Sequence, residues 1–148
     1  MKHIEEILRD EGIFVGQTEG DSMTPLIVQG RDSVIISPPT FPLKKYDVPV
    51  YKREDRYVMH RIVRVTKKGY VICGDNRAHL ERDITDKNIV GVLSAVVRDG
   101  KLLEATDDEF KRYGIRAVRE WPLRAVRFTV LRVVRKLASL FRRKGAKR

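Results

Sequence analysis

Three short segments of this chain carry side chains that could together perform acyl transfer. Ser22 lies within residues 20–25, His60 lies in a β-rich run, and Asp75 follows a glycine. A serine hydroxyl becomes a nucleophile at neutral pH only beside a general base, and histidine suits that role because its usual pKa is about 6.5. A carboxylate can hold the imidazole in the productive tautomer. The sequence therefore predicts Ser22 as the nucleophile, His60 as the base and Asp75 as the orienting acid.

This prediction depends on the order and the exact sequences of the three segments, because each residue type alone is also common in β domains that are not catalytic. The segments resemble the signal peptidase I family over roughly residues 12–100. The family's Ser-Met-x-Pro nucleophile motif matches residues 22–25, its base segment matches 57–62, and its Gly-Asp-Asn box matches 74–76. Bacterial housekeeping members carry lysine at the position of His60. The chain therefore resembles the histidine-using archaeal and endoplasmic-reticulum branch.

The resemblance also bears on the third member of the triad. In the histidine branch a second acid follows the Gly-Asp-Asn box by about six residues and can complete the triad. Glu81 stands at that distance and Asp83 lies just beyond it. Glu81 and Asp83 are therefore alternatives to Asp75. The activity implied by the resemblance is that of a serine endopeptidase, a hydrolase that processes a signal or leader segment by cutting after small residues.

The chain departs from the family at several points. A serine often stands two residues before the family nucleophile and helps the oxyanion hole, but Gly20 stands there in this chain. The family's Gly-Asp strand start resembles residues 45–51, with Tyr46 in place of the glycine. LexA-type repressors share the fold with signal peptidases but use a lysine base, and no lysine stands at the matching place. The alternative function is a non-catalytic signal-peptidase-like module that binds peptides or acts in regulation.

The hydrophobic pattern predicts a mainly β fold. Short apolar runs with a turn signal about every dozen residues favour antiparallel strands, which the resemblance implies are coiled sheets of the signal-peptidase/LexA type. A short helix is expected at 3–10. Residues 57–65 are expected to form one β run, with His60 on the same face as Val58 and Ile62.

The last forty residues differ sharply in charge from the rest of the chain. Residues 1–108 hold 17 Lys and Arg against 18 Asp and Glu, whereas residues 109–148 hold 14 against 2. We therefore expect a catalytic β domain at 1–108 and a basic amphipathic helical tail at 109–148, with a kink at Trp121-Pro122. Over 123–143 the helical period separates an apolar face from a basic one. The apolar face holds Val126, Val130, Val133, Val134, Leu137, Leu140 and Phe141, and the basic face holds Arg124, Arg127, Arg132, Arg135, Lys136 and Arg143.

A basic amphipathic helix is typical of a binder of anionic membrane surfaces, where Trp121 would suit the interface. Nucleic acid is the rival partner because clustered cations also neutralise phosphates. A third explanation is that the apolar face docks on the chain's own domain. The sequence leaves the oligomeric state open.

Composition limits the remaining possibilities. The single cysteine, Cys73, cannot form an internal disulfide, and one Cys with three scattered His lacks the spacing of a zinc site. We therefore expect no cofactor and no metal. The N-terminal residues do not read as a secretion signal, and no apolar run approaches a spanning length. The expected location is cytoplasmic, peripheral at a membrane, with a peptide or preprotein as substrate.

Overall fold

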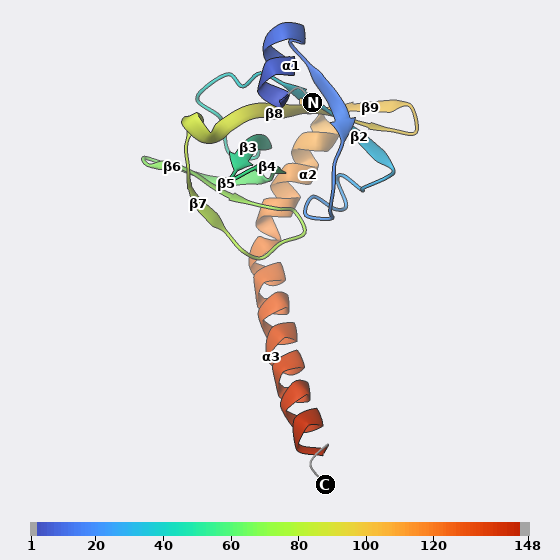
Figure 1. Cartoon of the computed structure of the whole chain (residues 1–148), viewed down its shortest axis with the longest axis vertical. Helices are drawn as coiled ribbons and strands as arrows, with labels where there is room; N and C mark the ends of the chain where they lie inside the picture. Colours follow the sequence, from blue (N-terminus) through green and yellow to red (C-terminus); the bar gives the residue numbers. More distant parts are fainter. Residues whose placement is uncertain (1–2, 146–148) are drawn as a thin grey trace.

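The computed structural model describes residues 3–145, with side chains as far as residue 139. The chain is mainly β, with a short N-terminal helix and a long helical segment at the C-terminal end (Figure 1). The helices α2 (Asp108–Arg119) and α3 (Trp121–Gly145) follow one another almost in line, and we call them together the rod. The prediction of a mainly β chain with a short N-terminal helix and a long C-terminal helix is therefore confirmed as a description of the fold class.

The larger sheet is built around one long strand. Its six strands pair antiparallel in the order β1-β2-β8-β3-β4, and β9 pairs with β8. They are β1 (Phe14–Gln17), β2 (Asp32–Ser37), β3 (Pro49–Arg53), β4 (Arg56–Met59), β8 (Ile89–Arg98) and β9 (Lys101–Glu104). The ten-residue β8 pairs with β2, β3 and β9. Because Val34 and Ile36 alternate with more exposed residues along β2, one face of this sheet is directed into the core.

The smaller sheet continues the chain immediately after β4. It contains β5 (Arg61–Thr66), β6 (Gly69–Cys73) and β7 (Glu81–Ile84), paired in that order. A 3-10 turn, η1 (Asp86–Asn88), then leads into β8. The smaller sheet therefore brings residues near 61, 73 and 81 side by side, because Arg61 pairs with Cys73 and Ile72 pairs with Glu81.

The expectation of one β run over 57–65 is wrong. The chain leaves the larger sheet after Met59, which pairs with Val50, and enters the smaller sheet at Arg61. His60 is the single residue between the two strands, and its N–H reaches the carbonyl of Pro49 at 3.4 Å. A strand that changes sheets must bend at the transfer point. His60 therefore lies at a corner, and simple alternation with Val58 and Ile62 does not set its direction.

The core consists of two clusters of buried side chains. The larger cluster is buried between the big sheet, helix α1 (Ile4–Glu11) and the segment that follows Ser22; it includes Leu8, Met23, Leu26, Ile27, Val34, Ile36, Val48, Val50, Leu93, Val96 and Phe110. The smaller cluster contains Leu43, Tyr51, Ile62, Tyr70, Ile72 and Ile89. Met23 and Ile62 belong to these clusters, so Ser22 lies beside the larger one, and Arg61, itself fully buried, lies beside the smaller one.

The two helices of the rod behave differently, although the sequence shows one continuous helical pattern. Helix α2 packs on the β domain and buries Phe110, Gly114 and Ala117. A Cβ at Gly114 would stand 2.8 Å from Nη1 of Arg61, so the glycine permits this close approach. Helix α3 projects away from the β domain (Figure 1). The break falls at Glu120, directly before the expected kink at Trp121-Pro122. No helix within the described residues is both long enough and apolar enough to cross a membrane.

Candidate active site

His60 contacts a carboxylate through one edge of its ring. Its Nδ1 lies 2.7 Å from Oε1 of Glu81, the first residue of β7. Both side chains are 13% exposed, so the pair is mostly shielded from water. The corner at His60 and the start of β7 create the contact, because the two sheets meet there.

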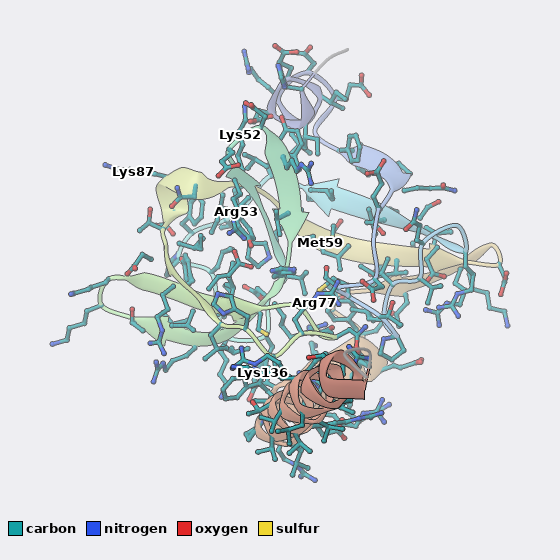
Figure 2. The ribbon with its side chains drawn as sticks, turned by 60° about the horizontal axis from the view of Figure 1, so that its bottom comes forward. Lys52, Arg53, Met59, Arg77, Lys87 and Lys136 are labelled. Atoms are coloured by element: carbon teal, nitrogen blue, oxygen red, sulfur yellow. The ribbon has the colours of Figure 1, made fainter. Side chains whose placement is uncertain are left out.

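Two further side chains hold the Glu81 carboxylate. The hydroxyl of Tyr51, which is fully buried, donates to Oε2 of Glu81 at 2.9 Å, and Arg53 reaches the same oxygen at 3.3 Å. Burial raises the pKa of Tyr51 well above its usual range, and the Glu81 carboxylate raises it further. Tyr51 therefore remains a hydroxyl donor at every working pH. Figure 2 labels Arg53 and Met59, which lie on the neighbouring strands β3 and β4.

The contact with Glu81 determines which nitrogen of His60 is free. A carboxylate only accepts hydrogen bonds, so Nδ1 must carry a proton and donate. In the neutral ring Nε2 then holds the lone pair and can accept a proton. Burial lowers the pKa of His60 below its usual value of 6.5, although the negative charge of Glu81 partly opposes this effect. The ring is therefore neutral at neutral pH, which is the state required of a general base.

The opposite edge of the His60 ring faces the Ser22 segment across Gly74. A Cβ at Gly74 would stand 2.7 Å from the carbonyl oxygen of Ser22 and 3.1 Å from Cδ2 of His60, the carbon bonded to Nε2. The Ser22 carbonyl and the His60 ring therefore both lie next to Gly74. The backbone N–H of Asn76 donates to the Ser22 carbonyl at 2.8 Å and ties the two segments together. Only a residue without a side chain fits between them.

The structure does not place Asp75 beside His60. The carboxylate of Asp75 is buried and accepts two hydrogen bonds from Arg61, one from Nε at 2.8 Å and one from Nη2 at 2.7 Å. Arg61 also donates to the carbonyl of Tyr46 at 3.0 Å, and its guanidinium lies over the rings of Phe110 and Tyr113. Both oxygens of Asp75 are therefore engaged beneath α2. Among the three predicted acids, the one that contacts His60 is Glu81.

Asp83 is also separated from His60. It is exposed, and its φ of 65° turns the chain within β7. Residues 81 and 83 of a regular strand would share a face, but the left-handed conformation at Asp83 breaks that pattern. Ser22, His60 and Glu81 are therefore the predicted site residues that the fold gathers, and Asp75 and Asp83 lie outside the cluster.

Several residues of the site had no distinguishing signal in the sequence. Tyr51 reads as an ordinary strand aromatic, although its hydroxyl also lies 3.3 Å from Nδ1 of His60. Arg77 forms a salt bridge with Asp21, next to Ser22, at 2.5 Å. Because Arg77 is also close to His60, its charge contributes to the lowered pKa of His60. Figure 2 shows Arg77 between the β domain and the rod.

The loop between β6 and β7 is anchored from the side of the rod. The indole N–H of Trp121 donates to the carbonyl of Ala78 at 3.0 Å. The thiol of Cys73 lies 3.1 Å from the carbonyl oxygen of His79 and donates to it. Burial raises the pKa of Cys73 to about 11, so the thiol stays protonated and keeps donating. The loop that touches Ser22 through Asn76 is thus held on its other side by Trp121 and Cys73.

The two positions that depart from the resembled family, Gly20 and Tyr46, both have a positive φ. Gly20 has a φ of 85°, and its N–H donates to the side chain of Gln29 at 2.8 Å. Tyr46, where the family has glycine, has a φ of 82°, in the region that favours glycine. Among the described residues no acceptor pairs with the backbone N–H of Ser22, which leaves that group available to an oxyanion.

Other features of the described residues lie away from this cluster. A cavity of about 560 Å³ opens between α2 and the β domain, and its walls include Leu43, Tyr46, Arg61, Phe110 and Ile115 but not Ser22, His60 or Glu81. No group of three or more His, Cys, Asp or Glu side chains within the described residues could hold a metal ion.

No family model matches this chain, and no curated protein is similar enough to count as a relative. The interpretation of the site therefore depends on its geometry and on the motif resemblance.

Proposed function

We propose that the chain is a serine endopeptidase of the signal peptidase type that processes a signal or leader segment, with Ser22 as nucleophile, His60 as general base and Glu81 as the orienting acid. The observation that supports this most is the His60 ring, which is paired with Glu81 at Nδ1 and faces the Ser22 segment with its other edge. A buried neutral histidine beside a serine segment suits nucleophilic catalysis.

In the proposed reaction Ser22 Oγ attacks the carbonyl carbon of a peptide bond while Nε2 of His60 takes the hydroxyl proton. The backbone N–H of Ser22 donates to the negative oxygen of the tetrahedral intermediate. Collapse breaks the C–N bond, and His60 gives its proton to the leaving amine. Water then repeats the sequence on the acyl-enzyme and releases the carboxylate product and free Ser22. Glu81 remains an anion throughout and stabilises the imidazolium.

The motif resemblance supports a substrate cut after small residues. The left-handed conformation at Tyr46 supports the resemblance further, because a glycine motif position and a positive φ belong together.

A comparison of protein N termini in cells tests this proposal. Cells that make the wild-type chain are compared with cells that make Ser22→Ala at equal abundance. Ser33→Ala is the matched control, because Ser33 is a half-buried serine on β2, outside the candidate site. We expect new N termini, preceded by small residues, with the wild type and the control but not with Ser22→Ala. Identical N termini in all three would contradict the proposal.

The second candidate is a non-catalytic peptide-binding or regulatory module, and the glycine at position 20 favours it because one potential oxyanion donor is missing. The two functions differ in their dependence on the hydroxyl. A binding module would retain its peptide ligands in Ser22→Ala with unchanged affinity and would show no cleavage in either form.

A further inference from the structure

The apolar side chains of α3 are exposed along its described length. Six of them are between 50% and 74% exposed: Leu123, Val126, Val130, Val133, Val134 and Leu137. At about 100° per residue these positions gather on one side of the helix and form what we call the apolar stripe. The β domain does not cover the stripe, so the explanation that the tail docks on its own domain applies to α2 and to Trp121 but not to the stripe.

The direction of the stripe follows from the continuity of the rod. Glu120 has an α-helical conformation, its N–H donates to Arg116, and its carbonyl accepts from the N–H of Arg124. The helical phase therefore passes from α2 to α3. Along this phase the residues that face the β domain are Phe110, Gly114 and Ala117 in α2, followed by Trp121 at the start of α3. The apolar stripe falls on the opposite side of the rod.

The charge of the rod indicates what covers the stripe. Residues 121–145 contain eight Lys and Arg and no Asp or Glu. On α2, the side in line with the stripe presents exposed Arg112, Arg116 and Arg119. Packing α3 against a second copy would bring two segments of this charge within about 10 Å of each other, and α3 itself has no acid to neutralise it. An anionic lipid surface instead accepts both the apolar side chains and the cations.

We propose that the rod lies flat on an anionic membrane surface, with the apolar stripe of α3 inserted between lipid headgroups, the outer arginines of α2 over the headgroups, and the β domain on the side away from the lipid. In this orientation Trp121 stays on the β domain through its bond to Ala78, so it is not an interfacial anchor.

Flotation with vesicles tests the surface, using the full chain. One variant, Val130→Gln with Val134→Gln, interrupts the stripe without changing charge. The matched control, Thr129→Gln with Ser139→Gln, makes the same number of changes outside the stripe. We expect the wild type and the control to float with phosphatidylcholine vesicles that contain phosphatidylglycerol. The stripe variant should lose about tenfold or more in partitioning, because two buried apolar side chains are replaced.

Quenching by brominated lipids tests the orientation, because Trp121 is the single tryptophan of the chain. We expect weak quenching of Trp121 and strong quenching in Trp121→Phe with Val130→Trp, which moves the probe into the stripe. Equal flotation of the stripe variant and the control would overturn the proposal. So would strong quenching of Trp121, binding to RNA with none to vesicles, or a dimer in sedimentation that the stripe variant dissolves.

Discussion

His60 and Arg61 are adjacent in the chain, yet each holds a carboxylate in a very different setting. The Arg61–Asp75 pair is almost completely buried beneath α2, and both oxygens of Asp75 are bonded to the guanidinium. The His60–Glu81 pair keeps some contact with water and leaves one ring nitrogen free of the acid. The first pair joins β5, the Gly74 loop and α2, whereas the second can move a proton. Of these two neighbouring residues, we therefore assign Arg61 to the stability of the fold and His60 to the proposed proton transfer.

The comparison predicts its largest effect at Glu81. Glu81→Gln removes the charge that stabilises the imidazolium, and the amide can present an N–H to Nδ1 and so favour the wrong tautomer. We expect peptide cleavage to fall by about 10³- to 10⁴-fold, with little change in the free energy of unfolding. Kinetics and denaturant unfolding of the same preparation measure both quantities. Cleavage within tenfold of the wild type would exclude Glu81 as the orienting acid.

The opposite pattern is expected for Asp75. Asp75→Asn leaves the buried guanidinium of Arg61 without its counter-charge, and breaking a buried pair in this way costs about 3–5 kcal/mol. Chemical denaturation should show this loss, and the fraction that remains folded should retain much of its activity. A stability loss below about 1 kcal/mol together with complete loss of cleavage would reverse the roles assigned to the two pairs.

Gly74 separates the two sides of the site, so a methyl group there should misplace both. Gly74→Ala would put Cβ 2.7 Å from the Ser22 carbonyl oxygen and force the segments apart. We expect about a 10²-fold loss of cleavage, because small displacements of reacting groups are costly. Gly100→Ala is the control: its φ of 74° strains the substituted backbone, but the position has open space and no contact with the site. Equal activity losses in the two variants would argue against the close contact at Gly74.

The pH dependence provides a smaller test of the same comparison. Burial lowers the pKa of His60, so cleavage should fall only as the pH drops through a value below 6.5. Because the folded pKa lies below the unfolded one, the stability linked to this group is also lost as the pH falls below about 6.5. Both Glu81 and Asp75 raise the pKa of His60, and Glu81 has the larger influence. NMR titration of the ring should therefore show a lower pKa than in the wild type for both variants, with the larger decrease in Glu81→Gln and the smaller decrease in Asp75→Asn. A larger shift in Asp75→Asn would contradict the assignment.

The smallest effect is expected at Trp121, which supports the loop from outside the site. Trp121→Phe removes one hydrogen bond to Ala78 and should reduce stability by about 1 kcal/mol. Hydrogen exchange should increase in residues 74–80 more than in the strands. Unchanged protection there would mean that the indole does not hold this loop.

Much of the secondary structure could be predicted from the sequence, because apolar alternation and turn residues act locally. The short N-terminal helix, expected at 3–10, is observed at 4–11, and the break in the C-terminal helix falls next to Trp121. The transfer of the chain between sheets at His60 was not predictable in this way. Residues 57–65 are uniformly β-rich, and only long-range pairing with Val50 and Cys73 decides where one strand ends.

The candidate site could be predicted in part. Ser22 and His60 can be predicted from residue type and motif. Which of the three acids contacts His60 cannot, because it depends on the fold: Arg61 binds Asp75, and Glu81 contacts His60. Arg61 itself reads as an ordinary charged strand residue, and its burial depends on two aromatic rings of α2 far along the chain. Similarly, the repeating helical pattern of the tail does not reveal that α2 packs on the β domain while α3 projects from it. This difference depends on Gly114 and on the surface of the β domain against which Gly114 packs.

Labelling of the purified full chain with a fluorophosphonate probe, followed by mass mapping of the modified residue, tests whether Ser22 is a nucleophile activated by His60 and Glu81. We expect a single adduct on Ser22 that forms slowly or not at all in His60→Ala and Glu81→Gln, and that forms at near wild-type rate in folded Asp75→Asn. An adduct on another residue, no adduct on the wild type, or labelling of Ser22 that is independent of both His60 and Glu81 would contradict it.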